Sequence, residues 1–181
     1  YVEQGFTVVL AGDKNHGEVT GIAGYAEEAS GGKAGFFYLV ESKEDTIKLI
    51  DSGALEQKKV ILLSQTTFSP KEFEAISAEL KAAPVSSIEI FNTICHATKE
   101  RQEALTELAK EVDGIVVIGG KESANTKRLF LSAQKLSSNV AFIESADELP
   151  EHFFELDTVG ITAGASTPDS VIYEVEERLE K

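Results

Sequence analysis

The sequence predicts an α/β fold made of two similar small modules, each a mostly parallel sheet flanked by helices. Short apolar runs with the length of buried strands recur along the chain, and they alternate with stretches whose apolar residues have helical spacing. Strands that alternate with helices are typical of parallel sheets joined by right-handed crossovers. The same rhythm recurs in the second half of the chain, which indicates a second module of the same kind.

The expected strands are the apolar runs at 7–11, 36–40, 60–63, 87–91, 114–118, 140–143 and 159–162. The expected helices lie at 43–51, 70–81, 99–111, 125–136 and 168–180. Pro70 and Pro168 follow Ser69 and Thr167, a pairing that suits an N-cap and a first helical turn. The segment 81–85 joins a helix to a strand without a glycine turn, so we expect the modules at 1–85 and 86–181.

The first residues have the pattern of a helix end. Tyr1 to Gln4 are followed by Gly5 and then by a strand, as expected for a last helical turn with a glycine C-cap. A last turn cannot nucleate a helix by itself. We therefore expect that the chain lacks an upstream segment; a frayed natural terminus is the alternative.

Composition and charge narrow the class of protein. With 42% hydrophobic and 27% charged residues, the composition is that of a globular protein. No apolar run approaches the roughly 20 residues of a membrane span, and no signal-peptide pattern is present. The net charge of −14 disfavours nucleic acid as a partner. The single cysteine, Cys95, excludes an intrachain disulfide and favours a cytoplasmic location.

Three loops predict an anion site. Ligands of open α/β sheets bind beyond the carboxyl ends of the strands, and the loops 64–69, 119–125 and 162–168 there are rich in small and hydroxyl residues. Each brings hydroxyls and free N–H groups to a helix N-terminus, which favours an anion. One such loop is more simply an N-cap, but three together predict a phosphate or diphosphate site. None has the spacing of a Walker loop.

Two further segments carry candidate chemistry. His16 and Glu18, in the loop 12–19, point the same way if that loop is extended, and could bind a phosphate or metal and move protons. The alternative is an exposed polar loop. Cys95 precedes a helix at the same sheet edge, which suits a nucleophile or a metal ligand, although a lone cysteine is more often a small buried hydrophobe. Its neighbour His96 would point elsewhere, which disfavours a Cys–His pair.

Together these loops resemble the LytB/IspH family, the 4-hydroxy-3-methylbut-2-enyl diphosphate reductases. The matching motifs, in chain order over the full length, are HGEVTG at 16–21, QTT at 65–67, NTICHAT at 92–98 with Arg101-Gln102, GKESANT at 120–126 and TAGAS at 162–166. The family converts hydroxymethylbutenyl diphosphate to isopentenyl and dimethylallyl diphosphate in the non-mevalonate isoprenoid pathway. It uses a [4Fe–4S] cluster and an electron donor such as ferredoxin or flavodoxin.

The resemblance assigns roles to particular residues. It implies that Glu18 relays protons and that Thr66 bonds the substrate hydroxyl or positions Glu18. It implies that the substrate diphosphate is held by His16, Ser123, Asn125 and Ser166. It makes Cys95 one of three cysteines that hold the cluster. The 1–85 module would then carry His16, Glu18 and Thr66, and the 86–181 module the other site residues.

The cysteine count departs from the family pattern. One thiolate does not hold a [4Fe–4S] cluster, so the resemblance implies that this chain is the last two of three modules and is inactive when isolated. A cluster-free module that binds an isoprenoid diphosphate is the alternative. An enzyme with Cys95 as nucleophile is a third reading.

Overall fold

The computed structural model describes residues 1–180, and the chain divides into a first unit, Tyr1–Cys95, and a second unit, His96–Lys181. Each unit is described on its own. Every strand pairing in both units is parallel, as the alternation of strands and helices predicts. No helix among residues 1–180 is both long and apolar enough to cross a membrane.

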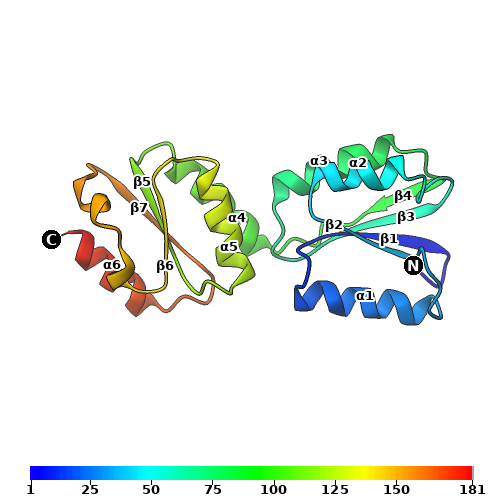
Figure 1. The fold of residues 1–181 in the computed structure, drawn as a ribbon, viewed down its shortest axis with the longest axis horizontal. Helices are drawn as coiled ribbons and strands as arrows, with labels where there is room; N and C mark the ends of the chain where they lie inside the picture. The colour runs from blue at the N-terminus through cyan, green and yellow to red at the C-terminus, as the bar shows by residue number, and fades with distance from the viewer. Residues whose placement is uncertain (181) are drawn as a thin grey trace. The chain divides into compact units, whose positions relative to one another are not determined.

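The first unit is a four-stranded sheet in the order β2-β1-β3-β4. Figure 1 shows α1 on one face of this sheet and α2 and α3 on the other. In chain order the elements are β1 (Phe6–Ala11), α1 (Gly17–Ala29), β2 (Phe37–Val40), α2 (Lys43–Asp51), β3 (Lys59–Ser64), α3 (Pro70–Ala82) and β4 (Ser87–Ile90).

The main core of the first unit lies under α2 and α3. Phe73, Ile76 and Leu80 of α3 are buried against strand residues such as Val60 and Leu62. A smaller cluster on the opposite face contains Phe6, Val8, Ile61 and, from α1, Ala26. One helix therefore covers a face as wide as the one that two helices cover on the other side.

The second unit is a three-stranded sheet in the order β6-β5-β7. Its elements are α4 (His96–Leu108), β5 (Gly114–Ile118), α5 (Ala124–Gln134), β6 (Val140–Ile143), the 3₁₀ turns η1 (Ala146–Glu148) and η2 (Glu151–Glu155), β7 (Val159–Ala163) and α6 (Asp169–Leu179). In Figure 1, α4 and α5 lie on one face of this sheet and α6 on the other.

Buried apolar side chains fill both faces of the second sheet. Leu105 of α4 and Leu129 of α5 pack against Ile115 and Val117. On the other face, Val175 of α6 belongs to the cluster that contains Val116 and Ile118. Strand β5 is buried along its whole length, as expected for a central parallel strand.

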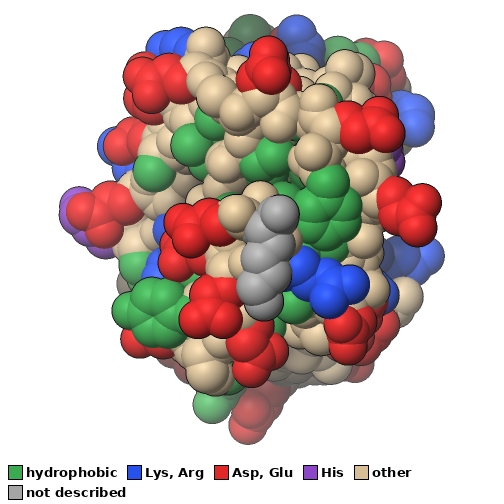
Figure 2. Space-filling view, turned by 90° about the vertical axis from the view of Figure 1, so that its left-hand side faces the viewer, with side chains coloured by type: hydrophobic (Ala, Val, Ile, Leu, Met, Phe, Trp, Pro, Cys, Tyr) green, Lys and Arg blue, Asp and Glu red, His purple; other side chains and the backbone are tan. Residues whose placement is uncertain are grey.

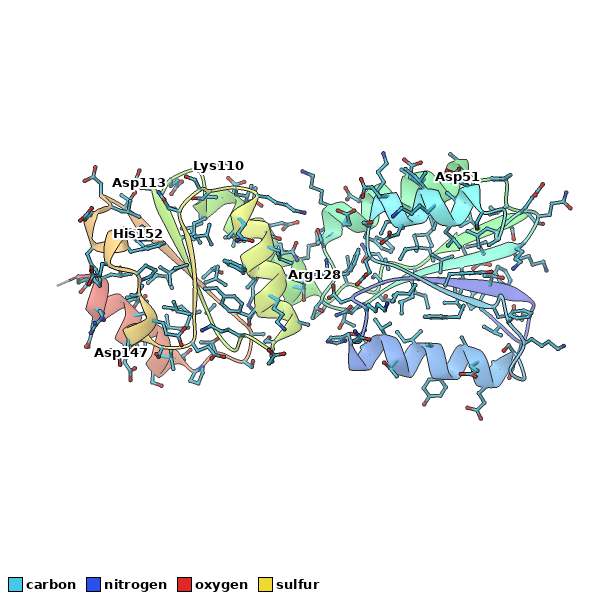
Figure 3. All side chains as sticks on the ribbon, viewed as in Figure 1. Asp51, Lys110, Asp113, Arg128, Asp147 and His152 are labelled. Carbon is cyan, nitrogen blue, oxygen red and sulfur yellow. The ribbon has the colours of Figure 1, made fainter. Side chains whose placement is uncertain are left out.

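The amino end of the second sheet is closed by polar side chains. Asp113 (labelled in Figure 3) directly precedes β5, and its Oδ2 accepts hydrogen bonds from the Thr158 N–H at 3.0 Å and hydroxyl at 2.7 Å. The Asn139 amide donates to the Asp113 carbonyl at 3.0 Å. These bonds tie together the residues that precede β5, β6 and β7, so loops free to meet a ligand lie at the carboxyl ends.

Two expectations are corrected. The segment 12–19 is not an extended loop throughout, because α1 begins at Gly17 with His16 as its N-cap. The sequence also predicts a module boundary after residue 85. Because β4 pairs with β3, residues 86–95 group with the first unit, and Cys95 with them. The link between helix α3 and strand β4 is a connection within one sheet.

Candidate functional site

The candidate residues of the first unit gather where β1 and β3 end. These strands are paired neighbours, with Ala11 opposite Ser64, so the loops that follow them lie side by side. His16 ends the first loop and caps α1: its Nδ1 accepts a hydrogen bond from the Glu18 N–H at 3.2 Å. Because Nδ1 is an acceptor, the proton of the neutral imidazole is on Nε2, which can donate to a ligand.

Glu18 and Thr66 meet through two hydrogen bonds. The Thr66 N–H donates to Glu18 Oε1 at 2.9 Å, and the Thr66 hydroxyl donates to Oε2 at 2.8 Å. One residue therefore engages both carboxylate oxygens and fixes the plane of the carboxylate. Glu18 sits in the first turn of α1, where the helix dipole also favours a negative charge.

The Gln65 side chain holds the two loops together. It is fully buried; its Oε1 accepts from the Asp13 N–H at 2.7 Å, and its Nε2 donates to the Thr67 hydroxyl at 2.8 Å. Gly12 allows this close approach, because a Cβ there would lie 2.8 Å from Val19 and 3.2 Å from Gln65 Oε1. The buried Gln65 side chain thus holds the loop that carries Thr66 in place.

Cys95 is exposed at the end of the first unit, beside the same loop. Its N–H donates to the Thr66 carbonyl at 2.8 Å. Upstream of it, Thr93 N–H donates to the Ser64 hydroxyl at 3.1 Å, and the Thr93 hydroxyl donates to the Ser64 carbonyl. Glu18, Thr66 and the Cys95 backbone are therefore linked in one hydrogen-bonded chain.

The structure disfavours two roles for Cys95. It is not the small buried hydrophobe that a lone cysteine usually is, since it is exposed. Nor does its neighbour serve as a base for it, because His96 Nδ1 lies 3.2 Å from Glu100 Oε2, one turn along α4.

In the second unit, Ser123 and Asn125 lie at the start of α5. Ser123 is the N-cap, and its hydroxyl accepts from the Thr126 N–H at 3.4 Å. The Asn125 amide nitrogen and the Thr126 hydroxyl are buried polar atoms that find no hydrogen-bond partner among the described residues. Such atoms are costly unless a ligand or water satisfies them. The two atoms are therefore free to bond a ligand or water at this helix N-terminus.

Ser166 lies in the loop after β7, which is the neighbour of β5, with Ile118 opposite Ala163. It is exposed. Two glycines bring the two loops of the second unit into contact: a Cβ on Gly164 would lie 2.2 Å from the Thr126 hydroxyl oxygen, and one on Gly119 would lie 2.6 Å from that of Thr167. The Ser166 loop therefore lies directly against the start of α5.

An ion pair braces the loop before α5. Lys121 Nζ lies 2.6 Å from Glu148 Oε2, and the Lys121 N–H donates to Glu144 Oε1 at 2.7 Å. The hydrogen bond to Glu148 raises the pKa of Lys121, and the same bond lowers the pKa of Glu148. Both groups are ionised at neutral pH and form an ion pair with each other. The Lys121 side chain therefore holds the loop in place.

Part of the surface of the second unit is acidic (Figure 2). Figure 2 shows one face of the second unit with many Asp and Glu side chains and few Lys or Arg. Exposed Glu174, Glu176 and Glu177 of α6 contribute to the acidic surface of this unit. A diphosphate is repelled by such a surface, whereas hydroxyls, amides and helix N-termini receive it.

The structure places the predicted residues in two groups, one in each unit. It brings Glu18, Thr66 and Cys95 together with the α1 cap His16, and it brings Ser123 and Asn125 next to the Ser166 loop. The sequence did not single out Gln65, Thr93 or Thr126 as site residues. For Gln65 the available signal was an amide directly after a strand, but an ordinary turn gives the same pattern. Thr126 lies inside α5 and has no such signal.

The residues present do not form a complete site for an iron–sulfur cluster. Cys95 is the only cysteine of the sequence, and residues 1–180 contain no group of three or more His, Cys, Asp or Glu side chains placed to hold a metal ion. Protein-bound clusters of this type are held by several thiolates. This chain can contribute one thiolate ligand.

Comparison with known proteins gives a consistent result. The family model described as LytB protein matches residues 1–180. The 4-hydroxy-3-methylbut-2-enyl diphosphate reductase of Treponema denticola is 48% identical over 174 residues, which are 95% of this chain and 57% of the relative. The Aquifex aeolicus protein of the same name is 42% identical, over 98% of this chain and 58% of the relative.

Two solved structures of reductases also match nearly the whole of this chain. A structure of (E)-4-hydroxy-3-methyl-but-2-enyl diphosphate reductase is 39% identical, with a TM-score of 0.51, over 99% of this chain and 60% of that one. The Plasmodium falciparum reductase structure is 26% identical, with a TM-score of 0.78, over 99% of this chain and 53% of that one. The chain thus spans less than two thirds of the length of these relatives.

Proposed function

This chain belongs to the LytB family, and we propose that it carries the diphosphate-binding and proton-handling residues of a 4-hydroxy-3-methylbut-2-enyl diphosphate reductase. Family membership supports the reaction. The two groups of loop residues support separate roles, with proton handling by one group and diphosphate binding mainly by the other. Because the chain spans 57% of the Treponema denticola relative, the reaction is proposed for the longer protein and not for these residues alone.

The Glu18–Thr66 pair is the observation that carries the proposal. Reducing an allylic alcohol breaks its C–O bond, and the departing hydroxyl must take up a proton to leave as water. A carboxyl group can supply that proton, and a threonine hydroxyl can both accept and donate. When Glu18 is protonated, the Thr66 hydroxyl can accept its proton and turn its own O–H towards the substrate hydroxyl. The Thr66 N–H still holds the other carboxylate oxygen.

The diphosphate is bound by donors at helix N-termini. His16 offers Nε2–H at the start of α1, and Ser123 and Asn125 offer a hydroxyl and an amide at the start of α5. Ser166 offers a further hydroxyl. The buried Asn125 amide nitrogen has no partner in the described part of the chain, which supports this role, because a phosphate oxygen would satisfy it.

Cys95 supplies one thiolate ligand to a [4Fe–4S] cluster in the complete protein. Its exposure beside the Thr66 loop supports this role. The remaining ligands must come from residues outside this chain. The two electrons that the reduction needs come from an external donor such as ferredoxin or flavodoxin.

A cluster-free module that binds an isoprenoid diphosphate is the second candidate. The single cysteine favours it. In that protein the loops would bind the same diphosphate ester, and Glu18 would have no reducing step to serve.

Calorimetric titration with hydroxymethylbutenyl diphosphate and with inorganic diphosphate tests the binding proposal. We expect binding by the unmodified chain and at least about a tenfold loss for Asn125→Ala, equivalent to about 1.4 kcal/mol. Ser170→Ala, an exposed position on α6, is the matched control. Equal affinities of all three proteins would contradict the site assignment.

Iron content and turnover separate the two candidates. In the longest form of the protein that can be expressed anaerobically, we expect bound iron and reductase activity. Glu18→Gln should abolish turnover while diphosphate binding persists, because the amide keeps the shape but cannot donate an acidic proton. Binding without iron in that longest form would favour the cluster-free module.

A further inference from the structure

The turn before α1 contains a residue with a left-handed backbone. Asn15 has a φ of +67°, and among residues 1–180 the only other non-glycine residue with a positive φ is Gln57, at +55°. This conformation is unfavourable for most L-residues, although asparagine tolerates it better than others. Such a residue persists only where its surroundings hold it in place, and residues of this kind cluster at functional sites.

Two consecutive backbone N–H groups just before Asn15 are held by side chains from other loops. The Asp13 N–H donates to Gln65 Oε1 at 2.7 Å, and Gln65 follows β3. The Lys14 N–H donates to Glu41 Oε1 at 2.7 Å, and Glu41 follows β2. Because β2 and β3 lie on either side of β1, the loop after β1 is held by the loops of both neighbouring strands. These bonds fix the path of the chain up to Asn15.

Asn15 turns the chain from this fixed segment into α1. The His16 N–H donates to the Asp13 carbonyl at 3.3 Å, which closes a four-residue turn. Of the two central residues, Lys14 and Asn15, only Asn15 has a positive φ. This is the pattern of a type II turn, whose third residue is usually glycine or asparagine. His16 leaves the turn in an extended conformation, with a φ of −85° and a ψ of 138°, and caps α1.

We propose that Asn15 is a positioning residue for His16. Its left-handed backbone completes the turn that places the His16 imidazole at the cap of α1, where Nδ1 accepts from the Glu18 N–H at 3.2 Å. The neutral imidazole then carries its proton on Nε2 and offers that N–H to a ligand. Asn15 acts through His16 and needs no contact with the ligand. The inference rests on the proposed function in one respect, because it takes this ligand to be a diphosphate.

The turn matters because the tautomer of His16 depends on it. If residue 15 changed to a negative φ, the chain would enter α1 in another direction and Nδ1 would leave the Glu18 N–H. The proton of the neutral imidazole would then be free to occupy either ring nitrogen. With the proton on Nδ1, the imidazole presents a lone pair instead of an N–H to a phosphate oxygen, which is repulsive. The same shift would move the Glu18 carboxylate away from the Thr66 hydroxyl.

Substitutions at position 15 test the proposal because they change the preferred backbone conformation in opposite directions. Asn15→Gly adopts a positive φ without steric cost, whereas the β-branched side chain of Asn15→Val strongly disfavours it. We expect Asn15→Val to weaken binding of inorganic diphosphate at least about tenfold, measured by calorimetry. Asn15→Gly is the conservative variant and should restore binding to within about twofold of the unmodified chain. Asn15→Ala, a milder change that keeps the unit folded, should fall between them.

The tautomer of His16 gives a readout that needs no ligand. Nitrogen–proton NMR correlation at about pH 8, where an ordinary imidazole is neutral, shows which ring nitrogen carries the proton. The His16 signals are assigned by their loss in His16→Gln. We expect the proton on Nε2 in the unmodified chain and in Asn15→Gly, and a mixture of tautomers in Asn15→Val. If the tautomers follow this pattern but the unmodified chain binds no diphosphate, the positioning role stands and the proposed function is overturned.

Gln57 provides the matched control. It has the same kind of left-handed backbone in the same unit, but it precedes β3 and so lies at the amino end of the sheet, away from the candidate site. Gln57→Val should destabilise the first unit in urea unfolding and leave both the diphosphate affinity and the His16 tautomer unchanged.

Three results would overturn the positioning role. Equal losses of affinity and tautomer in Gln57→Val and Asn15→Val would mean that general destabilisation explains both. A single Nε2 tautomer in Asn15→Val would mean that the turn does not set the tautomer. A mixture of tautomers in Asn15→Gly would assign the effect to the asparagine side chain and not to its backbone conformation.

Discussion

The loops at the carboxyl edges of the two sheets differ in how many of their polar side-chain atoms already have a hydrogen-bond partner. In the first unit, the side chains of Glu18, Gln65 and Thr66 bond to one another or to neighbouring backbone. In the second unit, the Asn125 amide and Thr126 hydroxyl are buried and find no partner among the described residues. The first arrangement holds a carboxylate in a set orientation before any ligand arrives, whereas the second has unused donors for a ligand. This difference suits a proton-handling group and an anion-binding group, respectively.

The largest effect is expected from removing the anchor of the first loop. Phe68 follows the Gln65–Thr67 turn and is fully buried in the core under α3. Phe68→Ala should cost the first unit about 3–5 kcal/mol and release Thr66 from Glu18. Urea unfolding followed by circular dichroism, with amide exchange to assign the unit, measures this. Phe154→Ala, at a 44% exposed position in the second unit, should change little. A comparable loss in both variants would refute the anchoring role.

Crowding the second pair of loops is expected to have the next largest effect. Gly164→Ala would place a Cβ 2.2 Å from the Thr126 hydroxyl oxygen, so the Ser166 loop must move away from α5. We expect a loss of about 1–3 kcal/mol in the second unit together with weaker diphosphate binding. Gly24→Ala provides the control, because a Cβ there meets nothing within 4 Å and lies inside α1. It should stabilise the first unit by about 0.4–1 kcal/mol. The crowding argument fails if Gly164→Ala unfolds at the same urea concentration as the unmodified chain.

Two threonine-to-valine substitutions compare the two edges directly. Thr66→Val removes the hydroxyl bonded to Glu18 and should cost about 0.5–1.5 kcal/mol. Thr126→Val removes a buried hydroxyl that has no partner among residues 1–180 and should be neutral or stabilising by up to about 1 kcal/mol. Thermal unfolding of both variants without ligand measures the difference. Equal destabilisation would mean that the Thr126 hydroxyl is already satisfied.

The two-module α/β fold was predictable from the sequence because buried parallel strands are nearly continuous apolar runs; β5 and β6 have the expected bounds. Helix α1 was missed because Gly17, Gly21 and Gly24 lower its intrinsic propensity. Packing of residues such as Val19 and Ala26 on the sheet stabilises it instead. The boundary after residue 85 was misplaced because an edge strand such as β4 is only half-buried and resembles the start of a new sheet.

The candidate site was predictable in part. The resemblance implies that Thr66 bonds the substrate hydroxyl or positions Glu18, and in the structure two hydrogen bonds join Thr66 to Glu18. Thr126 ends the GKESANT motif, but the resemblance assigns it no role. Its position depends on Gly119 and Gly164, which are far apart in the sequence and which let two loops approach the same hydroxyl. Contacts of that kind depend on the register of β5 and β7, which no local pattern specifies.

The smallest effect is a pH dependence confined to the second unit. The pKa of Glu148 is lowered by its hydrogen bond from Lys121, so this pair stabilises the fold above the ordinary glutamate pKa. That contribution is lost as the pH falls through the lowered value in the folded state. The raised pKa of Lys121 gives the opposite limb: its contribution is lost only as the pH rises through the raised lysine value.

Lys121→Gln should therefore flatten the acid limb of stability between about pH 3 and 6, measured by urea unfolding. Lys127→Gln makes the same change in net charge at an exposed pair with Glu122 and should leave that limb unchanged. If both variants flatten it equally, net charge and not the Lys121–Glu148 contact sets the pH dependence. The hydrogen bond from the Lys121 N–H to Glu144, and not the ion pair, would then be the contact that holds the loop before α5.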